Sequence, residues 1–196
     1  MTLSMPAAVL AGGASSRMGR PKAALRYGGG TLLEFQTRRL AETFEEVLVV
    51  VKEAPGFGVG PARVVLDRTP EAAAIHGLAR ALEEARDRIF VLAVDLPALT
   101  PAVARWIAER SLATEALAVV PRADGRLQPR AAVWRRAALP DVERHIARGQ
   151  RSLRDLADAV RAEIFEESDW RAADPSGAAF ANLNTLEEWE AHRERA

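Results

Sequence analysis

The chain has 196 residues, of which 48% are hydrophobic and 28% charged, as in ordinary globular proteins. Its 27 basic and 27 acidic residues cancel, which excludes a global field that would attract nucleic acid or an anionic membrane. The absence of cysteine excludes disulfides, thiolate metal sites and a cysteine nucleophile, and it agrees with a cytoplasmic protein. No apolar run approaches the ~20 residues of a membrane helix, and we expect no signal peptide.

Short β-prone runs alternate with helical patterns along the first two thirds of the chain. The runs predict strands over residues 7–11, 46–51, 62–67, 88–95 and 115–121. Helical spacing predicts helices over 31–44 and 75–85, and a third that starts at Pro101 with Thr100 as its N-cap. This alternation predicts an α/β fold, with a mostly parallel sheet that carries helices on both faces.

The pattern changes after residue 121. Asp124-Gly125 lies between two extended arms and predicts a small β-hairpin excursion. Helices are expected over 137–148 and 152–162, and residues 180–192 predict a short strand followed by a helix capped by Thr185 and Glu188. Because the sequence has no repeats, low-complexity tracts or linkers, we expect a single domain over residues 1–196.

The stretch "AVLAGGASSRMGRPKAAL" places glycines and positive charge directly after the first predicted strand. Gly12 and Gly13 allow backbone N–H groups to approach an anion closely. Arg17 can bind phosphate oxygens with a bidentate fork, and Lys22 supplies a compact charge. A glycine turn with solvated basic residues is the alternative, and the spacing is neither that of a Walker A loop nor that of the dinucleotide fingerprint. We favour phosphate binding.

Ligands of open α/β sheets bind beyond the carboxyl ends of the strands, which points to further polar residues. Asp95 ends a predicted buried strand and is a candidate Mg²⁺ ligand, with a capping or turn aspartate as the alternative. Asp67 also ends a strand, where it serves either a turn or a substrate contact. Asn182 and Asn184 point to one face of the last predicted strand, where they orient a ligand or form an edge-strand pair.

Together these residues resemble the molybdenum cofactor guanylyltransferases, the MobA family, within the nucleotidyltransferases of glycosyltransferase-A-like fold. "LAGGASSRMGRPKAAL" is similar to the signature loop of that family, "VDLPAL" to its Asp-Met-Pro metal motif, and "FANLNTLEE" to its Asn-x-Asn-Thr-Pro-Glu-Glu ending. The resemblance spans nearly the whole chain. It implies a three-layer, nucleotide-diphospho-sugar transferase or Rossmann-like fold.

The resemblance also implies a reaction in which GTP and Mg²⁺ bind at the loop and molybdopterin accepts GMP, with release of pyrophosphate. It implies catalytic contacts to the phosphates from Arg17 and Lys22, Mg²⁺ on Asp95, and Asn182 and Asn184 on the acceptor side. The nucleotide-binding residues that it implies are Leu10, Ala11, Gly12, Gly13, Lys22, Asp67 and Asp95. Proteins of molybdenum cofactor biosynthesis, or molybdoenzymes, would be partners. Such a reaction needs alignment and charge cancellation and no protein nucleophile.

The chain departs from the family pattern at "AAAIHGL", where many members carry a base-holding Gly-Pro-Leu-Ala-Gly segment. Gly77 matches the last glycine of that segment, whereas its proline and first glycine are missing. Gln128 replaces the common histidine before Pro129. Two alternatives therefore stay open. One is a related nucleotidyltransferase that uses CTP, or a sugar or polyol phosphate acceptor, and the other is a non-catalytic binding module on the same scaffold.

Overall fold

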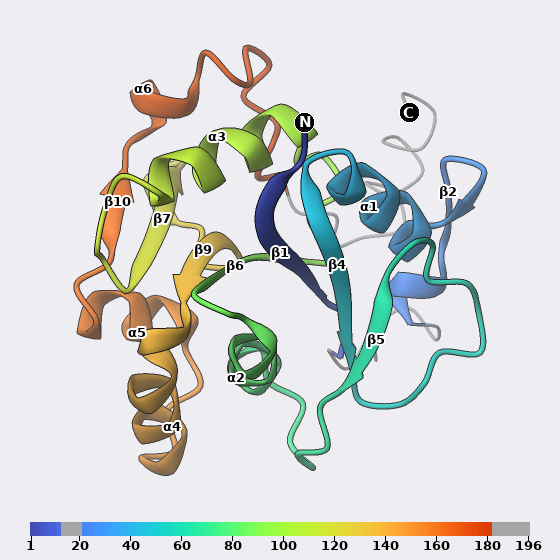
Figure 1. Cartoon of the computed structure of the whole chain (residues 1–196), viewed down its shortest axis with the longest axis horizontal. Helices are drawn as coiled ribbons and strands as arrows, with labels where there is room; N and C mark the ends of the chain where they lie inside the picture. The colour runs from blue at the N-terminus through green and yellow to red at the C-terminus, as the bar shows by residue number, and fades with distance from the viewer. Residues whose placement is uncertain (13–20, 182–196) are drawn as a thin grey trace.

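The computed structural model describes residues 1–12 and 21–181 of the chain. The strands of the main sheet are β1 (Leu3–Leu10), β4 (Phe44–Val51), β5 (Arg63–Leu66), β6 (Arg88–Ala93), β7 (Ala118–Ala123), β8 (Arg126–Leu127), β9 (Ala131–Arg135) and β10 (Glu163–Phe165). In the described part of the chain they form an eight-stranded sheet in the order β10-β7-β9-β6-β1-β4-β5, with β8 paired to β7 (Figure 1).

The sheet is mixed but mostly parallel, as the alternation of elements predicts. Strand β1 lies between β4 and β6 and is parallel to both, and β5 continues the parallel array beyond β4. Strand β9 is antiparallel to β6 and to β7, while β10 is parallel to β7. The carboxyl ends of β1, β4, β5 and β6 consequently meet at one edge of the sheet, where ligands of α/β proteins bind.

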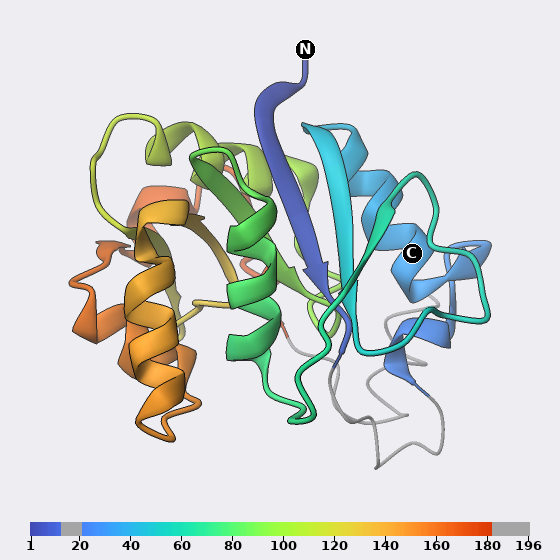
Figure 2. The same cartoon turned by 60° about the horizontal axis from the view of Figure 1, so that its bottom comes forward.

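Helices cover both faces of the sheet, so the predicted three-layer α/β fold is confirmed. The helices are α1 (Leu32–Ala41), α2 (Ala74–Glu84), α3 (Pro101–Ser111), α4 (Leu139–Ala147), α5 (Leu153–Ala159) and α6 (Glu167–Trp170). Helices α1, α3 and α6 share one hydrophobic core with the sheet, and α2, α4 and α5 share the other (Figure 2). Along β1 the side chains alternate between these cores, with Val9 in the first and Leu10 in the second.

Polar caps fix where the helices begin. The hydroxyl of Thr31 accepts from the backbone N–H of Glu34 at 3.1 Å, and the Glu34 carboxylate accepts from the backbone N–H of Thr31 at 2.8 Å. This reciprocal pair is a capping box. Thr100 caps α3 with Pro101 in its first turn, as predicted, and Ser152 caps α5. The predicted hairpin is confirmed too, with Asp124 and Gly125 at positive φ between β7 and β8.

Several predicted boundaries differ from those of the structure: the strands expected over 7–11 and 115–121 are Leu3–Leu10 and Ala118–Ala123, and the helix expected over 152–162 ends at Ala159. Two further differences bear on the core and the site. The helix expected over 31–44 ends at Ala41, and Phe44 begins β4 instead, where its buried ring stacks on Phe90 with 5.2 Å between centroids. The strand expected over 88–95 ends at Ala93, so Asp95 lies in the turn that follows.

Three short strands were not expected from the sequence. Strands β2 (Arg26–Tyr27) and β3 (Gly30–Thr31) form a hairpin whose turn, Gly28 and Gly29, has positive φ at both positions. Strand β10 adds a parallel edge beside β7. The strand expected from residue 180 onward does not begin there, since Phe180 lies in a turn and packs on Trp170; the rest of that prediction lies outside the described residues.

None of the helices in residues 1–12 and 21–181 is long and apolar enough to cross a membrane.

The centre of the sheet generates a first prediction. Phe90 is fully buried between β1 and β9, so replacing it with alanine should cost about 3–5 kcal/mol of unfolding free energy through lost burial and the cavity left behind. Urea denaturation followed by circular dichroism measures this loss. Leu112→Ala is the control, because Leu112 is 59% exposed and should change stability by no more than about 0.5 kcal/mol. Equal losses in the two variants would contradict the packing described.

Candidate active site

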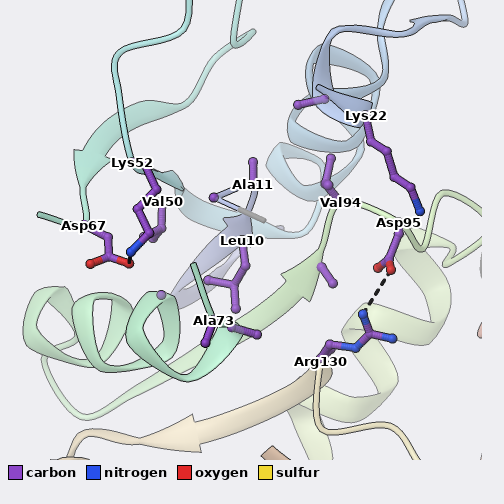
Figure 3. A pocket seen from close by; sticks show the side chains of 15 residues that line it. Leu10, Ala11, Lys22, Val50, Lys52, Asp67, Ala73, Val94, Asp95 and Arg130 are labelled. Carbon is purple, nitrogen blue, oxygen red and sulfur yellow. Dashed lines mark hydrogen bonds and ion pairs between the residues drawn. The ribbon is translucent and has the colours of Figure 1, made fainter. Parts of the chain in front are cut away.

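A pocket opens at the carboxyl edge of the sheet, beside the start of α2 (Figure 3). It brings together six of the residues that the sequence predicts for the site, from segments far apart in the chain. They are Leu10, Ala11, Gly12, Lys22, Asp67 and Asp95. Gly13, Arg17, Asn182 and Asn184 lie outside the described residues, so their predicted roles stay predictions.

The floor of the pocket is the end of β1 and its two neighbours. The backbone N–H of Ala11 donates to the carbonyl of Val50 at 2.9 Å, and that of Val94 donates to the carbonyl of Leu10 at 3.2 Å. Gly77 lies in the first turns of α2, and a Cβ there would come within 3.3 Å of the Leu10 side chain. The glycine therefore allows α2 to approach the end of β1, which closes the pocket on its apolar side.

Asp95 lies in the turn after β6, and its two carboxylate oxygens have different surroundings. The guanidinium of Arg130 donates to Oδ2 at 3.0 Å, whereas Oδ1 is buried and accepts no hydrogen bond from any described residue. Two side chains of α1 hold this turn: Gln36 donates to the carbonyl of Ala93 at 3.4 Å, and Arg39 to that of Pro97 at 3.1 Å. The structure thus fixes the backbone around a carboxylate whose Oδ1 is buried and unpaired among the described residues.

Lys22 reaches the pocket from a short 3-10 helix, η1 (Lys22–Ala24), that follows Pro21. Figure 3 shows Lys22 on the Asp95 side of the pocket, with Lys52 and Asp67 on the other side and Leu10 and Ala11 between them. The pocket therefore has two charged ends separated by a mainly apolar middle. An elongated ligand with a charged end and an apolar portion fits this distribution.

The second charged end is a hydrogen-bonded cluster around Lys52. Its ammonium donates to Asp67 Oδ2 at 2.6 Å, to the carbonyl and hydroxyl oxygens of Thr69 at 2.9 and 2.8 Å, and to the carbonyl of Glu71 at 2.6 Å. Asp67 Oδ1 accepts from the backbone N–H and the hydroxyl of Thr69. Lys52 therefore connects the end of β4 to residues 67–71, the segment that follows β5.

Burial and hydrogen bonding act in opposite directions on Asp67. Desolvation opposes its ionisation, but hydrogen bonds from Lys52 and Thr69 outweigh that effect and hold the pKa of the carboxyl below its ordinary value. A second carboxylate continues the cluster: Arg151 donates to Glu71 at 2.7 Å, and His76 lies 3.3 Å from the same group. The hydrogen bond from Arg151 is the main cause that lowers the pKa of Glu71 to about 2.

Sequence reasoning missed Lys52 and Arg130 as pocket residues. Lys52 follows β4 directly, so the rule that selected Asp67 and Asp95 applies to it as well. Arg130 precedes β9, and because β9 is antiparallel, its beginning lies at the carboxyl edge of the parallel strands. The direction of β9 is not evident from the local pattern, which is why Arg130 was not found.

The described residues contain no group of three or more His, Asp or Glu side chains that could hold a metal ion. A divalent ion at this pocket would consequently depend on Asp95 for a protein ligand from the described part of the chain, and on waters and substrate oxygens for the rest. That arrangement is typical of Mg²⁺, which keeps several waters and binds through one or two carboxylates plus phosphates.

Curated relatives resemble the chain over most of its length. A protein of Opitutus terrae is 39% identical over 85% of this chain and 87% of its own, and one of Chloroflexus aggregans is 33% identical over 92% of this chain and 89% of its own. Both carry the name "probable molybdenum cofactor guanylyltransferase".

Solved structures share the fold. Molybdopterin-guanine dinucleotide biosynthesis protein A from Archaeoglobus fulgidus superposes with a TM-score of 0.84 at 21% identity, covering 97% of this chain and 98% of its own. 2-C-methyl-D-erythritol 4-phosphate cytidylyltransferase from Thermus thermophilus reaches 0.68 at 20% identity, covering 100% and 98%. At these identities the likeness establishes the fold alone.

The fold and the pocket at its carboxyl edge define an α/β protein of the nucleotidyltransferase class. The model of the MobA-like NTP transferase domain matches residues 7–164, and the chain belongs to that family. The resemblance stated from the signature loop is thereby confirmed.

The low pKa of Glu71 predicts a pH dependence of stability. Since its folded value of about 2 lies below the ordinary 4.5, its pairing stabilises the fold above the unfolded pKa, and this contribution is lost as the pH falls toward the folded value. Glu71→Gln should therefore be less stable than the parent at neutral pH, and the difference should shrink between about pH 5 and about pH 3. Urea denaturation across that range measures it.

Glu53→Gln serves as the control, because Glu53 is exposed and its carboxylate pairs with none of the described residues. It should follow the parent at every pH. A stability difference between parent and Glu71→Gln that stayed constant down to about pH 3 would show that the Glu71 pairing is not the source of the effect.

Proposed function

We propose that this protein transfers GMP from GTP to molybdopterin and releases pyrophosphate, acting as one nucleotidyltransferase domain over residues 1–196 in the cytoplasm. The names of the relatives support this proposal. The observation that carries it is the pocket in which Lys22 and Asp95, whose buried Oδ1 has no hydrogen-bond partner among the described residues, meet the end of β1. The proposal keeps proteins of molybdenum cofactor biosynthesis and molybdoenzymes as partners that would take over the product.

The proposed reaction needs positioning more than covalent chemistry. An oxygen of the acceptor phosphate forms a bond to the α-phosphorus of GTP. The bond from that phosphorus to the bridging oxygen breaks, and pyrophosphate leaves with the electron pair. Lys22 offsets the negative charge that develops on the phosphates, and the backbone N–H of Gly12 approaches them. Arg17 keeps its predicted place on the phosphates beside Lys22.

Asp95 fits the role of an Mg²⁺ ligand. Its buried Oδ1 accepts no hydrogen bond from a described residue, and a hard oxygen donor of that kind is what Mg²⁺ prefers. When bound there, Mg²⁺ would neutralise phosphate charge and orient the oxygens around the α-phosphorus. Arg130 holds the other oxygen of Asp95, which fixes the direction in which Oδ1 points.

The remaining predicted site residues divide between the two substrates. Leu10, Ala11 and Gly12 line the nucleotide side, together with Gly13 by sequence position. The carboxylate of Asp67 accepts hydrogen bonds from Lys52 and Thr69 and can accept one more, through which it contacts the nucleotide. Asn182 and Asn184 belong to the acceptor side.

A second candidate is a related nucleotidyltransferase that uses CTP, or a sugar or polyol phosphate acceptor. It is favoured by the part of the pocket formed by Ala73, Ala74 and Gly77, which presents no polar side chain to a base. These residues lie within the "AAAIHGL" segment, where the chain departs from the family pattern.

Substitution of Asp95 and of Lys22 tests the catalytic proposal. Asp95→Asn keeps the size of the side chain but removes its charge, and Lys22→Ala removes the ammonium. Each should lower the rate of pyrophosphate release by about 100-fold or more. The negative charge that develops on the phosphates in the transition state then lacks either the metal ligand or the ammonium that stabilises it. Circular dichroism checks that both variants stay folded.

The matched control is Asp158→Asn, an exposed position on α5 away from the pocket, which should keep parental turnover. Full turnover by folded Asp95→Asn or Lys22→Ala would remove the role proposed for that residue. If the parent released no pyrophosphate with any nucleotide in the presence of molybdopterin, the non-catalytic module would be the better description.

A nucleotide panel tests the base. Calorimetric titration of GTP, CTP, ATP and UTP with Mg²⁺ should give the tightest dissociation constant for GTP, since a site built to pair the polar edge of one base rejects another that leaves its groups unpaired. The parent protein and the Asp158→Asn variant should give the same order. Tighter binding of CTP would overturn the guanylyl assignment while leaving nucleotidyl transfer intact.

A further inference from the structure

The ammonium of Lys52 has more acceptors around it than it has protons to donate. Four oxygens lie 2.6–2.9 Å from its Nζ: Oδ2 of Asp67, the carbonyl and hydroxyl oxygens of Thr69, and the carbonyl oxygen of Glu71. An ammonium has three N–H donors, so these oxygens take up its entire hydrogen-bonding capacity. Lys52 therefore lines the nucleotide pocket while its donors are directed at the protein.

The segment that Lys52 holds receives little stabilisation from burial. Residues 68–72 are all exposed, and they form neither a helix nor a strand. Lys52 binds the backbone carbonyls of Thr69 and Glu71 within this segment, and Arg151 pairs with the Glu71 carboxylate. The position of the segment consequently depends on these polar contacts more than on packing in the core.

The residues at the two ends of this segment form a wall of the nucleotide pocket. Asp67 precedes the segment and Ala73 follows it, and both line the pocket. Figure 3 shows Lys52 and Asp67 together on one side of the pocket and Asp95 on the other. The aliphatic part of Lys52 runs beside Gly12, where a Cβ would lie 3.5 Å from Lys52 Cγ. With the phosphates beside Asp95, the base of a nucleotide would lie beside Lys52 and Asp67.

We propose that Lys52 is a positioning residue for recognition of the base, which acts by holding Asp67 and the adjoining wall and not by binding phosphate. The inference rests on the proposed function, because it concerns the nucleotide of that reaction. Oδ1 of Asp67 accepts two hydrogen bonds from Thr69, and Oδ2 accepts one from Lys52, so the remaining acceptor position lies on Oδ2. Lys52 thereby determines the direction from which an N–H group of the base can approach Asp67.

Two probes separate a role in base recognition from a phosphate contact. Lys52→Met keeps the aliphatic part of the side chain and removes the ammonium. Calorimetric titration should give a dissociation constant for GTP with Mg²⁺ that is about tenfold higher or more than that of the parent, because Asp67 loses a charge-assisted hydrogen bond. The constant for inorganic tripolyphosphate with Mg²⁺ should stay within about twofold of the parent. Equal weakening for both probes would assign Lys52 to the phosphates and overturn the inference.

Arg68→Met is the matched control, because it removes one positive charge from the same segment at an exposed residue that does not line the nucleotide pocket. It should bind both probes like the parent, and a loss of GTP affinity equal to that of Lys52→Met would contradict the proposal. If Lys52→Met fails to fold, Lys52→Gln takes its place, since glutamine retains N–H donors for the carbonyls of Thr69 and Glu71 but not the charge. The same contrast between the two probes is expected of it.

A double-mutant cycle tests whether Lys52 acts through Asp67. In the Asp67→Asn background the ammonium has no carboxylate to hold, so the further change Lys52→Met should alter the dissociation constant of GTP by less than about threefold. The double variant also lacks the buried, unpaired carboxylate that Lys52→Met leaves behind, which favours its folding. A tenfold loss in both backgrounds would mean that the two residues act independently, and it would overturn the inference.

Turnover supplies an independent readout. With molybdopterin in excess, Lys52→Met should raise the KM for GTP about tenfold or more and keep kcat within about threefold of the parent, since Lys52 lies away from Asp95. A large loss of kcat with an unchanged KM would instead make Lys52 part of the catalytic machinery and overturn the proposal.

Hydrogen exchange distinguishes failure of this inference from failure of the proposed function. If the parent neither bound GTP nor released pyrophosphate, the proposed function would fail, but the positioning role could still be measured in the ligand-free protein. The backbone N–H groups of Asp67 and Thr69 are hydrogen-bonded, and they should exchange about tenfold faster or more in Lys52→Met than in the parent. Unchanged exchange at both positions would overturn the inference.

Discussion

The direction of the strands is the constraint on which the rest of the molecule depends. Because β1, β4, β5 and β6 are parallel, the residues that follow them meet at one edge, although their positions range from Leu10 to Asp95. Strand β9 is antiparallel to β6, so it begins at that same edge. Arg130, which directly precedes β9, therefore lies within hydrogen-bond distance of Asp95. Five loops thus supply one pocket, and its described charged residues lie far apart in sequence.

Charge compensation then determines which groups at this edge are available to a ligand. Lys52 and Arg151 are engaged by Asp67 and Glu71, and these pairs connect the segment after β5 to the end of β4 and to the loop before α5. The lowered pKa of both carboxyls follows from that pairing. Asp95 differs, because Arg130 satisfies only one of its oxygens. The structure therefore separates the paired carboxylates of Asp67 and Glu71, which hold the site together, from that of Asp95, which has one unpaired oxygen among the described residues.

Much of the fold and of the site could be predicted from the sequence, because both depend on local signals. Apolar runs, caps and glycines identified the main strands and helices, the strand-end rule identified Asp67 and Asp95, and the family resemblance implied Leu10. Phe44 was assigned to the wrong element because its place is set by the ring of Phe90, which is distant in sequence. The positions of strand β10 and of Arg130 depend on which strands become neighbours, and no local pattern encodes that.

In the complex with GTP that we propose, the hydrogen-bonding capacity of Asp67 would limit how the base is recognised. A carboxylate offers about four lone-pair sites, and those of Asp67 already accept three hydrogen bonds, one from Lys52 and two from Thr69. One site remains, whereas guanine presents two neighbouring donors, at N1 and at the exocyclic amine. Since Ala73, Ala74 and Gly77 add no polar side chain, the second donor needs a backbone carbonyl of this wall. Discrimination between bases would then depend on how firmly Lys52 and Arg151 hold the backbone after β5, which makes these two pairs part of the recognition surface.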